Sequence, residues 1–165
     1  MGLIDPVALQ RVGNFLVTRL KQQLLIQDQV ASGRLINSIE DQVIEGSDST
    51  SLIVLMAPHY IWAENGRNKG GKRPPLDAII QWVLDKGLES GDKEVISAAW
   101  AIQTFIWKNG TSRIVNGKKK RDFIQTVLDQ TQEELFNMTS EAVFTKFEAT
   151  IENIAKEATI KINKP

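Results

Sequence analysis

Two side chains in this sequence stand out as candidates for acid or base chemistry. His59 is the only histidine, and Glu64 stands between an aromatic cluster and a glycine turn. A serine nucleophile needs a base within hydrogen-bond reach, but no Gly-x-Ser-x-Gly turn directs a serine to His59. We therefore favour a structural or exposed role for His59. For Glu64 we favour a role in capping the turn or in pairing with Arg67 or Arg73.

Paired carboxylates and phosphate-binding glycines give no stronger prediction of chemistry. Glycosidases and metal-dependent nucleases need two acids that converge on one point. Glu40 and Asp41 are neighbours that would face opposite sides of a strand, whereas Glu133-Glu134 and Glu148/Glu152 are typical of solvated helix faces. The glycines of "NKGGK" lack the strand-loop-helix order of a phosphate site. The sequence predicts no catalytic, cofactor-binding or metal-binding residue and no enzyme; a small hydrolase using Glu64 or His59 is the last-ranked alternative.

Two loops concentrate positive charge on a chain that is neutral overall, with 20 basic and 20 acidic residues. Such loops can contact DNA phosphates, stay solvated, or pair with acids on a neighbouring subunit. Trp82, Trp100 and Trp107 lie at helical spacing, which is more typical of packing than of base stacking. The loop cations are Arg67, Lys69, Lys72 and Arg73 in the first loop and Lys118, Lys119, Lys120 and Arg121 in the second.

The elements that position these residues begin with a helix and a hairpin. Asp5-Pro6 is a helix start, and apolar residues at three- and four-residue spacing predict a helix to about residue 27. A short helical turn is expected at 33–38. Strands at 39–45 and 52–56 flank a turn-prone segment and predict a hairpin. The second strand has no polar face, so we expect the protein or a neighbouring subunit to cover both its faces. Residues 59–63 could add an edge strand.

Helical patterns dominate the second half. Pro74-Pro75 opens a helix that ends at Lys86-Gly87, and a third helix spans about 93–108. That helix carries one apolar stripe with Val95 and Ala99 and a second with Ile96, Trp100 and Trp107. Two stripes predict burial on two sides, between a sheet and other helices or against another copy. An exposed hairpin is expected at 111–121, followed by helical segments at 122–137 and 140–162 that are one kinked helix or two.

Length and composition predict one α+β domain. A chain of 165 residues fits one domain, with a small antiparallel β-sheet packed by several α-helices. We divide it into a core at 1–121 and a C-terminal helical extension at 122–165. No cysteine is present, and the longest apolar run, Leu52 to Ala57, is far shorter than a membrane span. We expect an intracellular protein with no membrane partner.

The segment from Tyr60 onward resembles a known family. Tyr60, Glu64-Asn65-Gly66, a basic glycine loop, Pro74-Pro75, "IIQWVLDKGL" and a helix ending at Gly110 occur in that order. They resemble small tailed-bacteriophage proteins of the HK97 tail-component group, which act as neck, tail-completion or head-tail joining proteins. The resemblance covers about Leu20 to Val127. Arg67 stands where the family usually has threonine, the basic loop is long, and the extension beyond Gln130 is larger than the family core.

The resemblance implies a structural virion protein that forms a ring, of six or twelve copies, in the neck that joins head to tail. Its partners would be portal, adaptor and tail proteins, with non-specific contact to genomic DNA in the channel. It would be located in the virion, and in the host cytoplasm during assembly. The alternatives are a tail terminator that caps the tail tube, or a DNA-binding module that uses the basic loops. Expected interface residues are Tyr60, Trp62, Glu64, Arg67, Lys69, Lys72, Arg73, Trp100, Trp107, Arg113, Lys118, Lys119, Lys120 and Arg121.

Overall fold

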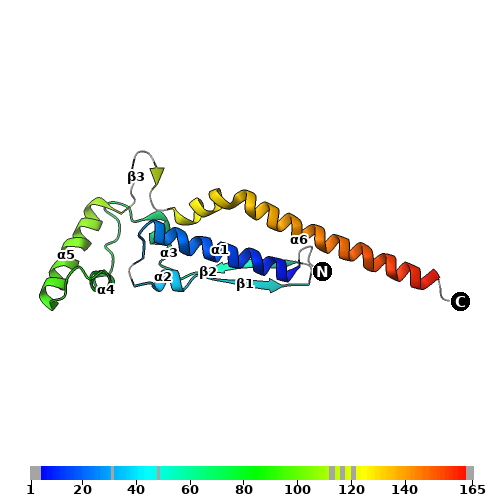
Figure 1. Ribbon diagram of the computed structural model, residues 1–165. Helices are drawn as coiled ribbons and strands as arrows, with labels where there is room; N and C mark the ends of the chain where they lie inside the picture. The colour runs from blue at the N-terminus through cyan, green and yellow to red at the C-terminus, as the bar shows by residue number, and fades with distance from the viewer. Residues whose placement is uncertain are drawn as a thin grey trace. The chain divides into compact units, whose positions relative to one another are not determined.

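The computed structural model describes residues 5–30, 32–47, 49–111, 114–115, 118–119 and 122–162. Among the described residues, six helices and two hairpins follow one another, and Figure 1 shows their arrangement along the chain. Backbone contacts divide the chain into two compact units. Unit 1 holds residues 1–19, 40–55 and 128–165, and unit 2 holds residues 20–39 and 56–127. The expected α+β fold class is confirmed: a small antiparallel sheet is combined with helices and a C-terminal helix.

Unit 1 is built on the β-hairpin. Strands β1 (Glu40–Glu45) and β2 (Thr50–Leu55) pair antiparallel from Glu40↔Leu55 to Glu45↔Thr50. The Gly46 amide donates to the Ser49 carbonyl at 2.7 Å and closes the turn. The hairpin predicted from two strand-like segments on either side of a turn-prone stretch is therefore confirmed, with boundaries shifted by one or two residues.

Helix α1 (Pro6–Ile26) packs against this hairpin through its first half. Gly13 is buried, and a Cβ atom added there would collide with the side chains of Asp41 and Leu52. Gln10 donates a hydrogen bond to the Asp41 carboxylate. A glycine at this position lets the helix approach the sheet closely. Further along α1, Arg19 forms an ion pair at 3.3 Å with Glu134 of helix α6 (Phe123–Ile162).

The alternative that other parts of the chain cover both faces of the second strand is wrong for the described residues, whereas cover by a neighbouring subunit stays a prediction. Burial alternates along β2, and Ile53 and Leu55 remain exposed while Leu52 and Val54 are half-buried. A two-stranded sheet with a helix on one face leaves its other face open. An all-apolar strand sequence alone does not show whether a second layer exists.

Unit 2 contains the end of α1 and four shorter helices. The helices are α2 (Arg34–Asn37), α3 (Tyr60–Asn65), α4 (Leu76–Asp85) and α5 (Asp92–Asn109). Helices α4 and α5 share a core of Val83, Val95 and Ala99, surrounded by half-buried aliphatic side chains. Gly87 takes a left-handed conformation with φ 61° just after α4, as the Lys86-Gly87 pattern predicts.

The edge strand expected at 59–63 is wrong, because this segment starts helix α3. The Tyr60 amide donates to the Ala57 carbonyl at 2.9 Å, and the Trp62 amide donates to the His59 carbonyl at 3.0 Å. These bonds curl the chain after Pro58 into a helical turn. Gly66, with φ 68°, then ends the helix. Aromatic residues favour strands only where a neighbouring strand is available.

The second stripe of α5 also departs from expectation. Val95 and Ala99 of the first stripe are buried, but Ile96 and Trp100 of the second are exposed and Trp107 is half-buried. No described element covers that side of the helix. The alternative of burial between a sheet and other helices is therefore wrong.

Residues 123–162 form the single helix α6. The Thr139 hydroxyl, near the predicted kink, donates to the Leu135 carbonyl at 2.8 Å, a bond that a mid-helix threonine can make without ending the helix.

The hairpin predicted at 111–121 is confirmed in its described part, where β3 (Ile114–Val115) pairs antiparallel with β4 (Lys118–Lys119). Across the described residues, no helix has the length and apolar composition to cross a membrane.

Candidate functional site

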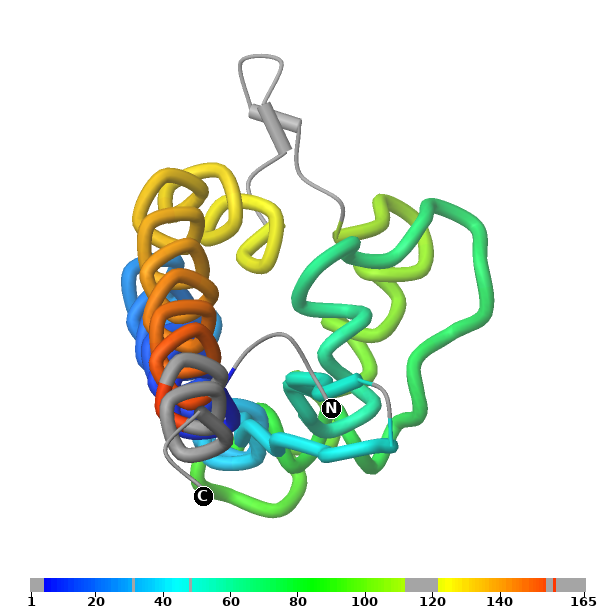
Figure 2. The backbone as a smooth tube through the Cα atoms, turned by 90° about the vertical axis from the view of Figure 1, so that its right-hand side faces the viewer, coloured from blue at the N-terminus to red at the C-terminus, as the bar shows by residue number. Residues whose placement is uncertain are grey.

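The first basic loop, residues 66–75 between α3 and α4, is held against the end of α5. In Figure 2 this connection bows outward between the helices that it joins. The Gly70 amide donates to the Trp107 carbonyl at 2.8 Å. The Arg67 amide donates to the Thr111 hydroxyl at 2.8 Å, and the Thr111 amide returns a bond to the Arg67 carbonyl at 2.8 Å. The backbone of this glycine-rich basic loop is thus held from Arg67 to Gly70.

Gly110 makes this close approach possible. It has φ 73°, and an added Cβ atom would lie 2.6 Å from the Arg67 carbonyl oxygen and 3.0 Å from the Lys69 nitrogen. A side chain there would face both backbone strain and a collision with the loop. Gln103 supports the other end of the loop, because its buried side-chain amide donates to the Pro74 carbonyl at 2.8 Å.

Two arginines of the loop stack on tryptophans from the flanking helices. The Arg67 guanidinium lies 3.8 Å from the ring centre of Trp62 on α3, and the Arg73 guanidinium lies 4.4 Å from that of Trp107 on α5. Partial burial lowers the pKa of Arg67 from its ordinary value, yet a guanidinium stays charged in proteins. Stacking fixes the plane of each cation while its N–H edge can still bind a carboxylate or a phosphate.

Lys69 and Lys72 complete the loop cluster and are exposed. Among the described residues, none of the four cations forms an ion pair with an acid: the ion pairs present join Arg19–Glu134, Arg34–Asp85, Lys86–Asp28 and Lys156–Glu152. Unit 2 therefore presents a basic loop in which two guanidinium groups are held by stacking and two lysines are exposed, and these charges are not neutralised within the described residues. We call Arg67, Lys69, Lys72 and Arg73, with Trp62 and Trp107, the basic-aromatic face.

Glu64 has a structural partner that sequence reasoning did not anticipate. Its Oε2 atom accepts a hydrogen bond from the Ile124 amide at 2.9 Å, and Oε1 accepts from the Gln125 amide at 3.4 Å. These amides belong to the first turn of α6, where N–H groups have no partner within the helix. The predicted pairing with Arg67 or Arg73 is wrong, because both arginines stack on tryptophans. The predicted cap is found on a distant helix instead of the local turn.

His59 borders a groove in unit 2 with a volume of about 1040 Å³. The groove is also lined by Trp62 and Trp82, and Arg34 approaches Asp85 to 3.8 Å at its edge. No hydrogen bond in the described part of the chain joins His59 to an acid or a serine. Nor do the described residues contain a group of three or more histidine or acidic side chains placed to hold a metal ion.

The structure brings some of the predicted interface residues together and leaves others outside the described part. Arg67 and Arg73, from one loop, stack on Trp62 and Trp107 as two separate pairs, and Tyr60 and Glu64 lie on α3 with Trp62. Trp100 lies on the exposed side of α5. Lys118 and Lys119 are described only as backbone in β4. Arg113, Lys120 and Arg121 lie outside the described residues.

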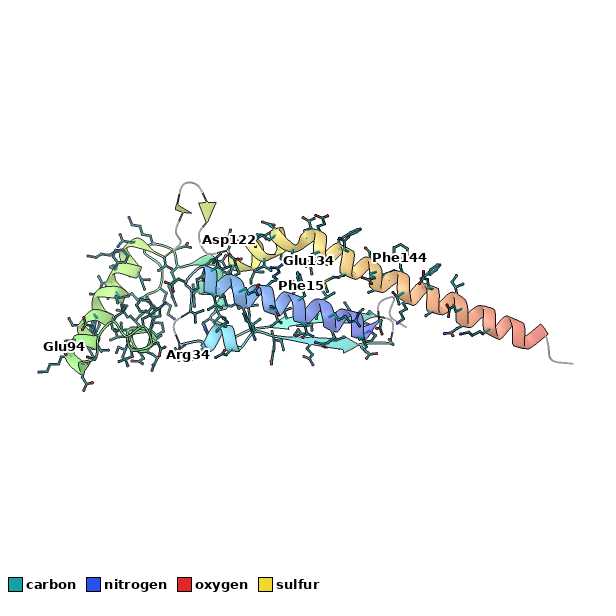
Figure 3. The ribbon with its side chains drawn as sticks, in the orientation of Figure 1. Phe15, Arg34, Glu94, Asp122, Glu134 and Phe144 are labelled. Atoms are coloured by element: carbon teal, nitrogen blue, oxygen red, sulfur yellow. The ribbon has the colours of Figure 1, made fainter. Side chains whose placement is uncertain are left out.

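Sequence reasoning missed a second surface, on α6. Phe136, Phe144 and Phe147 are each more than 60% exposed, and Val143 and Ile151 are exposed beside them. Figure 3 shows Phe144 projecting from α6. The spacing of these residues is visible in the sequence, but a buried apolar stripe has the same spacing, so the spacing alone does not reveal exposure.

Comparison of the chain with protein-family models, with curated proteins and with solved structures gave no match.

Proposed function

We propose that this chain is a structural virion protein of a tailed bacteriophage, which forms a ring in the neck that joins head to tail. The proposal starts from the resemblance of residues 20–127 to head-tail joining proteins. The observation that carries it is that α6 has apolar residues on two opposite sides. One side is used within unit 1, and the other remains available for a partner.

The two sides of α6 follow from helix geometry. Thr131 and Ala142 are buried in unit 1. At about 100° per residue, Phe144 lies roughly 160° around the helix from Ala142. Phe136, Val143, Phe147 and Ile151 share the side of Phe144, and we call these five residues the apolar stripe. A surface helix normally has a single apolar stripe that faces its own core.

Exposed apolar stripes of this kind are typical of interaction sites. Contiguous apolar patches are rare on soluble monomers and mark partner surfaces. Ile96 and Trp100 on α5 add a second exposed apolar surface. When identical subunits associate head to tail and the rotation closes, they form a ring. The two exposed apolar surfaces therefore support assembly as the function.

Two further observations favour a structural role over catalysis. The carboxylate of Glu64, which a hydrolase would need, is engaged by two backbone amides of α6. His59 has no acid or serine bound to it in the described part of the chain. The basic-aromatic face, by contrast, is built and exposed, so it supports contacts with acidic protein surfaces or nucleic acid.

The test is to image the purified protein and to measure its mass in solution, both alone and mixed with the portal and tail proteins of the same phage. We expect rings by negative-stain microscopy, a matching mass by light scattering, and antibody labelling between head and tail in virions. A protein that stays monomeric at all concentrations, joins no neighbour and is absent from virions would refute the proposal.

A second candidate function is DNA binding, favoured by the four unneutralised cations of the loop. Each phosphate contact would make affinity for duplex DNA fall with rising salt. In this case fluorescence anisotropy would show a steep loss of affinity between roughly 50 and 200 mM salt, the range over which phosphate contacts weaken. Lys69→Glu/Lys72→Glu would abolish the binding, whereas Lys93→Glu, an exposed change elsewhere, would not.

A further inference from the structure

A row of glutamates runs beside the apolar stripe of α6. Glu134, Glu141, Glu148 and Glu152 are separated by seven, seven and four residues, so they share one side of the helix. Glu134 is paired with Arg19, and Glu152 lies 3.8 Å from Lys156. Glu141 and Glu148 are exposed and form no ion pair within the described residues. At about 100° per residue, Glu141 and Glu148 lie within roughly 60° of Phe144.

The basic-aromatic face of unit 2 has the complementary composition. Its arginines are fixed in place on Trp62 and Trp107, and Lys69 and Lys72 are exposed beside them. Along α5 the exposed Trp100 and Ile96 extend from Trp107, at helical spacing on one side. This arrangement joins an apolar strip to cations that lack acidic partners. An acidic helix with an aromatic stripe would satisfy both parts.

We propose that the apolar stripe of α6, with Glu141 and Glu148, docks on the basic-aromatic face of a second copy of this chain. This inference rests on the proposed function, and it names the interface of the ring. Each copy carries one α6 and one basic-aromatic face, so each donates one contact and accepts one. Apolar side chains would fill the centre of the interface, with charge pairs at its rim.

Pairing of α6 with α6 is a poorer match. In an antiparallel pair that meets through the apolar stripes, the glutamate rows of the two helices would face each other, which is repulsive. In a parallel pair, the glutamate row would face a flank that offers only Lys146 as a cation. Neither arrangement uses the four cations of the loop. Charge complementarity therefore selects the basic-aromatic face as the partner of α6.

The chain contains no cysteine, so each introduced cysteine is the only thiol. Phe144→Cys protein and Lys72→Cys protein are purified separately, mixed, and treated with a short bismaleimide linker. We expect a cross-linked pair that contains one chain of each kind, identified by mass spectrometry. The matched control replaces Lys72→Cys with Ser51→Cys, an exposed position on β2, and should give little of this product.

Charge reversal provides a second measurement. Glu141→Lys/Glu148→Lys, and separately Lys69→Glu/Lys72→Glu, should each weaken self-association at least about tenfold in analytical ultracentrifugation, or roughly 1.4 kcal/mol. All four residues are exposed, so these changes should leave the fold intact, which circular dichroism verifies. A chain that carries both reversals should regain association.

The other outcomes overturn the inference in distinguishable ways. Cross-linking of Phe144→Cys protein only with itself would show an α6–α6 contact instead. A further variant carries both Lys72→Cys and Phe144→Cys in one chain. If the linker joins these two cysteines within one chain, and the mixed single variants give no product, the apolar stripe and the basic-aromatic face meet inside a monomer. Rings without the mixed product would refute this interface and leave the proposed function standing. The mixed product in a protein absent from virions would refute only the proposed function.

Discussion

At the scale of single residues, Glu64 is an acid used to start a helix. Its two carboxylate oxygens accept bonds from the first free amides of α6, which lies 60 residues further along the chain. A carboxylate is well suited to this place because the N-terminus of a helix carries partial positive charge. The contact ties α3 to the beginning of α6 within unit 2.

Two substitutions of Glu64 should lower the free energy of unfolding by different amounts. We expect Glu64→Ala to reduce the free energy of unfolding by about 1–2 kcal/mol, because it removes the cap and its charge. Glu64→Gln should cost about half as much, since the amide oxygen can still accept a bond. Urea denaturation measures both variants, with Glu89→Ala and Glu89→Gln as exposed controls. A Glu64→Ala protein as stable as its control would contradict this role.

Gly110 and Gly87 form a matched pair for testing the base of the loop. Both have positive φ, but an added Cβ meets the Arg67 carbonyl oxygen at Gly110 and nothing within 4 Å at Gly87. Gly87→Ala should therefore cost about 1 kcal/mol from backbone strain alone. Gly110→Ala should cost more, about 2–3 kcal/mol, because the loop must also move.

Thermal unfolding of the two alanine variants provides the comparison. We expect the lower melting temperature for Gly110→Ala, and weaker near-ultraviolet dichroism from Trp107 if the loop has shifted. Equal melting temperatures would mean that the loop does not lie as close to Gly110 as described.

At the scale of elements, α6 uses apolar residues for two different purposes. Phe123 at its start is fully buried, whereas Phe144 is 67% exposed. The two phenylalanines have the same chemistry and belong to the same helix, but their surroundings in the tertiary structure differ. The first contributes to stability, and the second is available for association.

Substitution of these two phenylalanines should separate folding from assembly. Phe123→Ala should cost about 3–5 kcal/mol, because it leaves a cavity in a closed core. Phe144→Ser should change stability by less than about 0.5 kcal/mol, because the side chain is exposed, while it weakens self-association. Denaturation curves and light scattering on the same samples test both statements. An equal loss of stability in the two variants would show that Phe144 is buried within the monomer.

At the scale of the whole molecule, a neutral chain separates its charges. The net charge is zero, yet unit 2 carries four loop cations without acidic partners among the described residues, and unit 1 carries exposed glutamates on α6. If positive and negative side chains were evenly mixed, the surface would favour contact with water. Because they are separated between the two units, identical copies have surfaces of complementary charge. The division into a core at 1–121 and an extension at 122–165 stays a prediction. The prediction of a single domain stays a prediction.

The sequence by itself determined the local elements. Proline at a helix start, glycine at a helix end and the spacing of apolar residues act within a few residues, so α1, α4, α5 and the β1–β2 hairpin follow from them. The tertiary structure alone decided which apolar stripe is covered, which is why Ile53, Trp100 and Phe144 are exposed although their patterns match buried positions. It also decided that Glu64 binds α6 and that two loop arginines stack on tryptophans. The contacts of Glu64 with α6 and of Arg73 with Trp107 join residues far apart in the chain, and no local pattern specifies them.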